Sequence, residues 1–179
     1  MTTPTRTFVE GRYVPTGPWA AQKIEDQVDH LKGSFRPGET REERTLFDAH
    51  GDVADRATAR ALLTAAIGPK VAFHRLVLSP GRRAGVVRPI DLRTWTRLLL
   101  MDLGHALGQR LVWVAAVHRN TDDPHIHVLL AGAAARTRWP NNGTVRGVEL
   151  RPPHYALLRE RGDLRAAEIR QLNGDGTAA

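Results

Sequence analysis

Three histidines in the second half of the chain, His118, His125 and His127, have the types and spacing of a metal site. Side chains two residues apart on a β-strand point to the same face, so His125 and His127 share a face if they lie on a strand. Residues 119–124 are polar turn formers and predict an antiparallel hairpin that brings His118 beside the other two. Three neutral imidazoles suit a borderline divalent cation and leave coordination positions for a phosphate.

The elements that must position these histidines are two apolar runs. Residues 111–117 are apolar and predict a buried strand that ends at His118, and residues 128–130 continue the strand that starts at His125. A single histidine near a strand end is usually only hydrogen-bonded, which is the structural alternative. The third histidine across a short turn favours the metal site over that alternative.

The composition predicts one domain, residues 1–179, with an ordered core from about residue 6 to 172. A chain of 179 residues with 41% hydrophobic content fits a single core. The chain has no cysteine, which excludes disulfides and thiolate metal sites. No apolar run approaches the roughly 20 residues of a membrane span, and the N-terminus lacks an apolar signal core, so we expect a cytoplasmic location.

The net charge of +7 favours a polyanionic partner. Lys23, Lys32 and Lys70 are the only lysines, so arginine makes up the rest of the 26 basic residues. Guanidinium groups bind phosphates bidentately, which suits nucleic acid. GC-rich codon usage produces the same arginine bias without any ligand, so this signal is unspecific.

Strands and helices alternate along the rest of the chain, and the hairpin makes part of the sheet antiparallel. The pattern predicts an α+β fold with a mainly antiparallel five-stranded sheet and helices packed on it. The expected helices begin or end at recognisable residues: Asp52 or Asp55 caps the second, and Asp91 caps the third, which ends near Gly108. The expected elements are strands 6–14 and 71–78, and helices 19–32, 54–67, 91–108 and 154–172.

Residues 114–132 resemble the histidine-hydrophobe-histidine (HUH) motif of conjugative relaxases, which nick single-stranded DNA at a transfer origin. In that family a strand ends in His, a short polar turn with Pro follows, and His-x-His opens the next strand; each of these elements is present here. Residues 73–80 and 46–52 are similar to other parts of relaxases of the T-DNA-border and mobilisation type. The resemblance covers residues from about 22 to 172.

The resemblance implies an HUH relaxase-like fold with a ferredoxin-like palm. It implies a divalent metal ion, Mn, Mg or Zn, held by His118, His125 and His127. It also implies a partner: single-stranded or hairpin DNA at an origin of a plasmid or integrative element, with relaxosome accessory proteins as further partners.

The nucleophile that such a nickase needs is missing from its expected place. In the family it is usually a tyrosine on the first helix, and Gly33 stands at that position here. Candidates to replace it are His30, one helical turn earlier and oriented by Asp26, and Tyr13 on the first strand. A solvent-facing His30 is the structural alternative. A further possibility is that nothing replaces the tyrosine, and the domain binds DNA without cutting.

Other polar residues are candidates for supporting roles. Asp122, Asp123 and Asn120 lie between the motif histidines and are predicted to orient an imidazole, with ordinary turn chemistry as the alternative. Residues predicted to contact DNA are Arg136, Arg138, Arg146 and Tyr155. The alternatives are a solvated helix face for the arginines and a packing role for Tyr155.

Three functions remain open from the sequence. The first is metal-dependent nicking and transesterification of single-stranded DNA. The second is a nuclease-inactive module that recognises an origin. The third is a metal-dependent hydrolase that uses water as the nucleophile.

Overall fold

A five-stranded sheet with strand order β1-β3-β5-β4-β2 runs through the middle of the molecule, and every neighbouring pair of strands is antiparallel. This is the α+β fold that the sequence predicts. The computed structural model describes residues 6–33, 44–81, 84–86, 88–119, 123–135 and 147–175. The elements are β1 (Phe8–Pro15), α1 (Ala20–Gly33), β2 (Leu46–Phe47), α2 (Arg56–Thr64), β3 (Val71–Ser79), α3 (Pro89–Leu107), β4 (Gln109–His118), β5 (His125–Ala135) and α4 (Pro152–Asp175).

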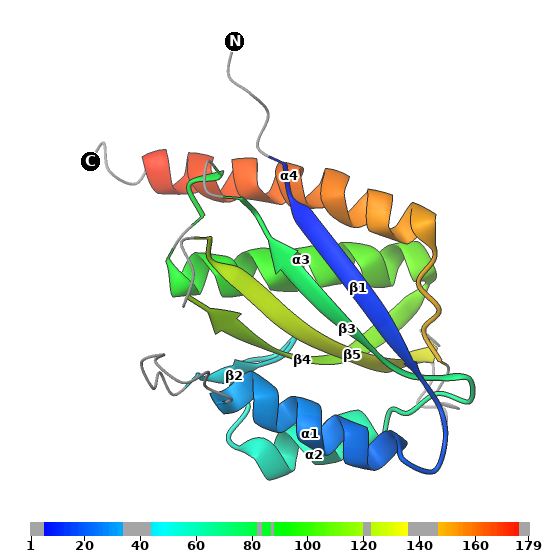
Figure 1. The fold of residues 1–179 in the computed structure, drawn as a ribbon. Coiled ribbons are helices and arrows are strands. Elements are labelled where there is room, and N and C mark those ends of the chain that lie inside the picture. The colour runs from blue at the N-terminus through cyan, green and yellow to red at the C-terminus, as the bar shows by residue number, and fades with distance from the viewer. Residues whose placement is uncertain are drawn as a thin grey trace.

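Helices cover both faces of the sheet, with α3 and α4 on one side and α1 and α2 on the other (Figure 1). The strands therefore bury side chains in both directions. On β5, Ile126 and Val128 pack in the core beneath α3 and α4, whereas Leu129 packs in the core beneath α1 and α2. Because side chains alternate along a strand, this pattern places His125 and His127 on the same face as Leu129.

The first helix forms as its apolar stripe predicts. Ala20, Ile24, Val28 and Leu31 are all buried, each at one-turn spacing from the next. The residues between them face outward or lie along the rim of the helix. This orientation places one edge of α1 over the sheet near the end of the histidine hairpin.

The structure shows which residues begin the helices α2 and α3. Asp55, not Asp52, caps α2, because its carboxylate accepts the backbone N–H of Thr58 at 2.7 Å. The prediction of Asp91 as the cap of α3 is wrong. The helix begins at Pro89, whose missing N–H and fixed φ suit the first turn, and Asp91 lies inside that turn.

The sheet has two unequal edges. The short strand β2 was not predicted as a strand; Leu46 and Phe47 pair with Ala116 and Ala115 of β4. At the other edge, β1 pairs with β3 along its whole length. In the part of the chain that the structure describes, no helix combines the length and the apolar character needed to cross a bilayer.

Candidate metal centre

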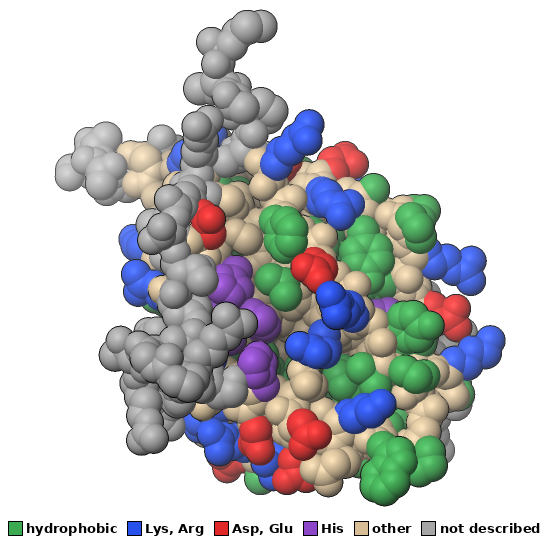
Figure 2. All heavy atoms as spheres, in the orientation of Figure 1, with side chains coloured by type: hydrophobic (Ala, Val, Ile, Leu, Met, Phe, Trp, Pro, Cys, Tyr) green, Lys and Arg blue, Asp and Glu red, His purple; other side chains and the backbone are tan. Residues whose placement is uncertain are grey.

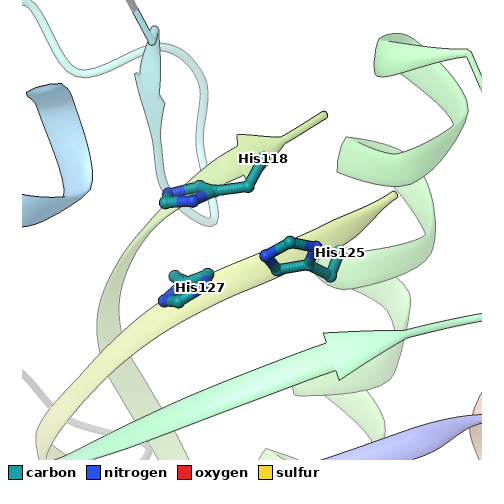
Figure 3. Close-up of side chains that lie close together, drawn as sticks. All are labelled: His118, His125 and His127. Carbon is teal, nitrogen blue, oxygen red and sulfur yellow. The ribbon is translucent and has the colours of Figure 1, made fainter. Parts of the chain in front are cut away.

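The hairpin of β4 and β5 places the three motif histidines on one face of the sheet. His118 lies opposite His125, and His127 lies opposite Ala116. His125 and His127 lie four and two residues before Leu129 on β5, so they share its face of the sheet. Ala116 packs in the same core as Leu129, and His118, two residues after Ala116 on β4, shares that face too. All three imidazoles therefore lie on the α1/α2 face, where Figure 3 shows the rings close together.

The rings converge as a metal site requires. One nitrogen from each ring can be chosen so that all three lie within 4.8 Å of one another. The ring centroids of His118 and His127 are 4.1 Å apart, and those of His125 and His127 are 5.1 Å apart. Nitrogens bound to one ion at about 2.1 Å lie at most about 4.2 Å apart, and the ion lies in the plane of each ring. The His118 and His127 rings are stacked with 18° between their planes, so at least one of them must rotate to complete the site.

The burial of His118 leaves one of its ring nitrogens open to a ligand. Its side chain is 4% exposed, and its Nε2 is buried without a hydrogen-bond partner. A buried polar atom in this state costs free energy unless a water, an ion or another group satisfies it. A divalent cation between the three rings would satisfy it, so the donor set fits such an ion.

Burial keeps the site in the form that binds cations. Burial, and after it the proximity of His127, lowers the pKa of His118 to about 2. Burial, followed by His125 and His30, lowers the pKa of His127 to about 4. Both rings are therefore neutral at physiological pH, with a lone pair available for an ion.

A backbone carbonyl orients the third ring. His125 Nδ1 lies 3.0 Å from the carbonyl oxygen of Asp123, and a proton on Nδ1 leaves the Nε2 lone pair for a ligand. The group that orients His125 is thus the main-chain carbonyl of Asp123, whereas the sequence suggested the side-chain carboxylate. The other two residues predicted for this role, Asp122 and Asn120, lie outside the described residues.

The structure brings His30 to the triad. Its ring centroid is 6.1 Å from that of His127, with 57° between the ring planes. His30 is half-buried in the last turn of α1, and it lines the same cavity as His127. Asp26, predicted to orient it, accepts a hydrogen bond from Gln22 at 3.2 Å.

Tyr13 is not near the triad. It lies on the edge strand β1 opposite His74, whose Nε2 bonds the carbonyl of Val148 in the core beneath α3 and α4. Tyr13 therefore points to the face opposite the histidines, and its side chain is 65% exposed. The prediction that Tyr13 reaches the site depended on β1 being a central strand, whereas the strand order places β1 at an edge of the sheet.

Tyr155 also lies on the far face. It extends from the first turn of α4 over Gly11 of β1, where a Cβ would stand 2.6 Å from its hydroxyl oxygen. Burial raises the pKa of its hydroxyl. Tyr13 and Tyr155 are the two tyrosines of the chain, and both lie on the face opposite the triad. The predicted DNA contacts Arg136, Arg138 and Arg146 lie outside the described residues.

Two arginines near the triad were not singled out from the sequence. Arg44 is buried just before β2 and, like His30, lowers the pKa of His118. Arg75 lies on β3 and lowers the pKa of His127. Arg75 is a charged residue within the otherwise apolar run of β3, and this exception in the sequence could have identified it as a candidate. Figure 2 shows the histidines gathered on one face, with Lys or Arg side chains beside them.

The comparisons with known proteins support the fold. No protein-family model matches the chain, and no curated protein matches it. A solved structure from work on the molecular basis of vancomycin resistance transfer in Staphylococcus aureus has a TM-score of 0.50 to this chain at 9% sequence identity. The match covers 94% of each chain, so it extends over nearly the whole sheet and its helices. At this identity the likeness is one of fold.

Proposed function

We propose that this domain nicks and rejoins single-stranded DNA at an origin of transfer, using a divalent ion held by His118, His125 and His127. The observation that carries the proposal is the convergence of the three imidazole rings on the sheet face beneath α1, with His30 of α1 beside them. The HUH-like spacing of the histidines, the net charge of +7 and a fold shared with a protein from resistance transfer support it. The bound ion supplies Lewis-acid polarisation of a phosphate oxygen.

His30 is the proposed nucleophile. The lone pair of its attacking nitrogen forms a bond to phosphorus as the bond from phosphorus to the 3′ oxygen breaks. The imidazole then loses its ring proton, and the leaving 3′ oxygen gains one, so charge and protons balance. The product is a phosphohistidine linked to the 5′ end of one DNA segment, and attack by a 3′ hydroxyl reverses it.

The position of His30 suits this role. It comes from a helix that packs on the sheet through Val28 and Leu31, so its backbone is fixed relative to the hairpin. Its ring centroid lies 6.1 Å from that of His127, and both rings line the cavity beside the triad. The half-buried position restricts water, which favours linkage over hydrolysis.

A second candidate function is an origin-binding module that does not cut. The observation that favours it is the absence of both tyrosines from the triad face. In that case the ion and the basic surface hold DNA, and His30 has no covalent role.

The test is a covalent-capture assay with a pool of random single-stranded oligonucleotides labelled at the 3′ end. With Mn²⁺, we expect an SDS-stable, proteinase-sensitive band for the wild type and for Tyr13→Phe. His30→Ala should reduce it at least about 10³-fold, as loss of a nucleophile does in other covalent enzymes. His125→Ala should also abolish it.

The chemistry of the bond provides a further check. A phosphorus–nitrogen bond to histidine is labile in acid and stable in alkali, whereas a tyrosine phosphodiester survives acid. Cut DNA that is not linked to protein would identify water as the nucleophile. DNA retention without any cut would establish the binding module instead.

A further inference from the structure

A cavity of about 280 Å³ lies next to the triad, between α1 and strands β1, β3 and β5. His30 and His127 form part of its wall, and Arg75 and Arg12 form another part. The strand register aligns these groups: His127 lies opposite Val77 on β3, and Val77 lies opposite Glu10 on β1. The cavity therefore continues from the candidate metal centre across the sheet toward its β1 edge.

The side chain of Arg75 makes no hydrogen bond or ion pair with another residue in the described part of the chain. Asp26 and Asp29 of α1 line a neighbouring pocket together with Arg75, and both have other partners. Asp29 pairs with Arg60 at 2.8 Å, and Asp26 accepts from Gln22. The Arg75 guanidinium is exposed beside the cavity with its donors available.

The pairing of β1 with β3 adds a second observation. Arg12 and Arg75 are directly opposite each other and share the α1/α2 face. Like charges at directly opposite positions of an antiparallel pair repel, so an anion between these two side chains would stabilise the arrangement. Glu10 offsets only part of the repulsion, since its contact with Arg12 is 3.6 Å long and both side chains are exposed.

We propose that this cavity is a nucleotide subsite in which Arg75 binds the phosphate adjacent to the one held at the triad. Arg12 adds positive charge at the rim, and Gln27 and Glu10 face the base or sugar of the same nucleotide. The subsite sets which segment of the strand enters the reaction, because it holds the DNA on one side of the scissile bond. The inference rests on the proposed function in taking single-stranded DNA as the ligand.

The experiment measures binding of a fluorescein-labelled oligothymidylate by anisotropy in EDTA at several salt concentrations. Arg75→Gln should weaken binding about tenfold at low salt, the loss of one charged hydrogen-bonded contact. The slope of log K against log salt should become shallower by about 0.7, the value for one phosphate on a single strand. Arg75→Lys should keep most of the slope, because a lysine also displaces a counterion.

Arg110→Gln is the matched control, because it removes the same charge from an exposed arginine near the start of β4, far along the strand from His118. A slope for Arg75→Gln equal to that of Arg110→Gln would overturn the subsite, as would a wild type that does not bind the probe. Without metal the assay is independent of nicking. An Arg75-dependent slope without a covalent band would reject only the nickase, and a covalent band with an unchanged slope would reject only the subsite.

Discussion

At the scale of single residues, two buried histidines on opposite faces of the sheet have different surroundings. His74 and His118 are both almost fully buried, and in both cases burial lowers the pKa. His74 bonds the carbonyl of Val148 at 2.6 Å through Nε2, and its Nδ1 is buried without a partner. His118 has a buried Nε2 without such a bond and lies beside two more imidazoles. The same residue type therefore packs in the core on one face of the sheet and, on the other face, lies in a cluster that could hold a metal ion.

His74 gives a prediction for the pH dependence of stability. Its pKa is lowered in the folded state from 6.5, so the unfolded chain takes up a proton first as the pH falls. Its contribution to stability is complete above pH 6.5 and is lost as the pH falls toward the folded pKa, by up to about 1.4 kcal/mol per pH unit. In urea titrations, His74→Phe should be about 1–3 kcal/mol less stable at neutral pH, because the Val148 carbonyl loses its donor.

Below pH 6.5 the stability of His74→Phe should also fall less steeply than that of the wild type. Other buried histidines still contribute to the decline in both proteins. Parallel curves for the two proteins would show that His74 is protonated to the same extent folded and unfolded, contrary to its burial.

At the scale of elements, the sequence predicted those features that depend on residues close together in the chain. The parity of His125 and His127 and the apolar stripe of α1 follow from residue spacing alone, and both are confirmed. The position of Tyr13 depends on the order of strands, which spacing within β1 does not encode. The cavity beside Arg75 likewise depends on how α1 packs across three strands, so no short segment of sequence contains it.

The docking of α4 on β1 gives a prediction at this scale. A Cβ at Gly11 would stand 2.6 Å from the Tyr155 hydroxyl oxygen and 2.8 Å from Cδ2 of Leu76. Gly11→Ala should therefore cost about 1–3 kcal/mol in chemical denaturation. Tyr155→Leu in the same chain should recover part of the loss, since the two residues are in contact.

Gly17→Ala is the control for this prediction, because nothing lies within 4 Å of its Cβ position. We expect it to change stability by less than about 0.5 kcal/mol. Equal effects at Gly11 and Gly17 would show that Tyr155 does not pack on β1. A packing role for Tyr155 also explains why an aromatic residue at the start of α4 faces away from the triad.

At the scale of the whole molecule, the sheet separates the histidine cluster from the core that contains Trp95. The face beneath α3 and α4 holds Trp95, whose indole N–H donates to the carbonyl of Gly162 at 2.9 Å in a buried hydrogen bond. The face beneath α1 and α2 holds the three histidines, His30 and the arginine-lined cavity. Because the triad spans only β4 and β5, it is anchored by the most extensive strand pairing in the fold. An ion bound there would stabilise the entire folded state.

This coupling gives a prediction for global stability. After removal of metal with EDTA, adding Mn²⁺ to 100 times its dissociation constant should stabilise the fold by about 2.7 kcal/mol, since the ion binds only the folded site. In a chain of this length each kcal/mol raises Tm by about 2–4 °C, so thermal unfolding should shift upward by about 5–10 °C. His125→Ala should remove the shift, because two imidazoles hold the ion weakly. His105→Ala, on the exposed side of α3, should preserve it. An equal rise in Tm for the wild type and His125→Ala would mean that the ion binds elsewhere and that the three histidines are not a metal centre.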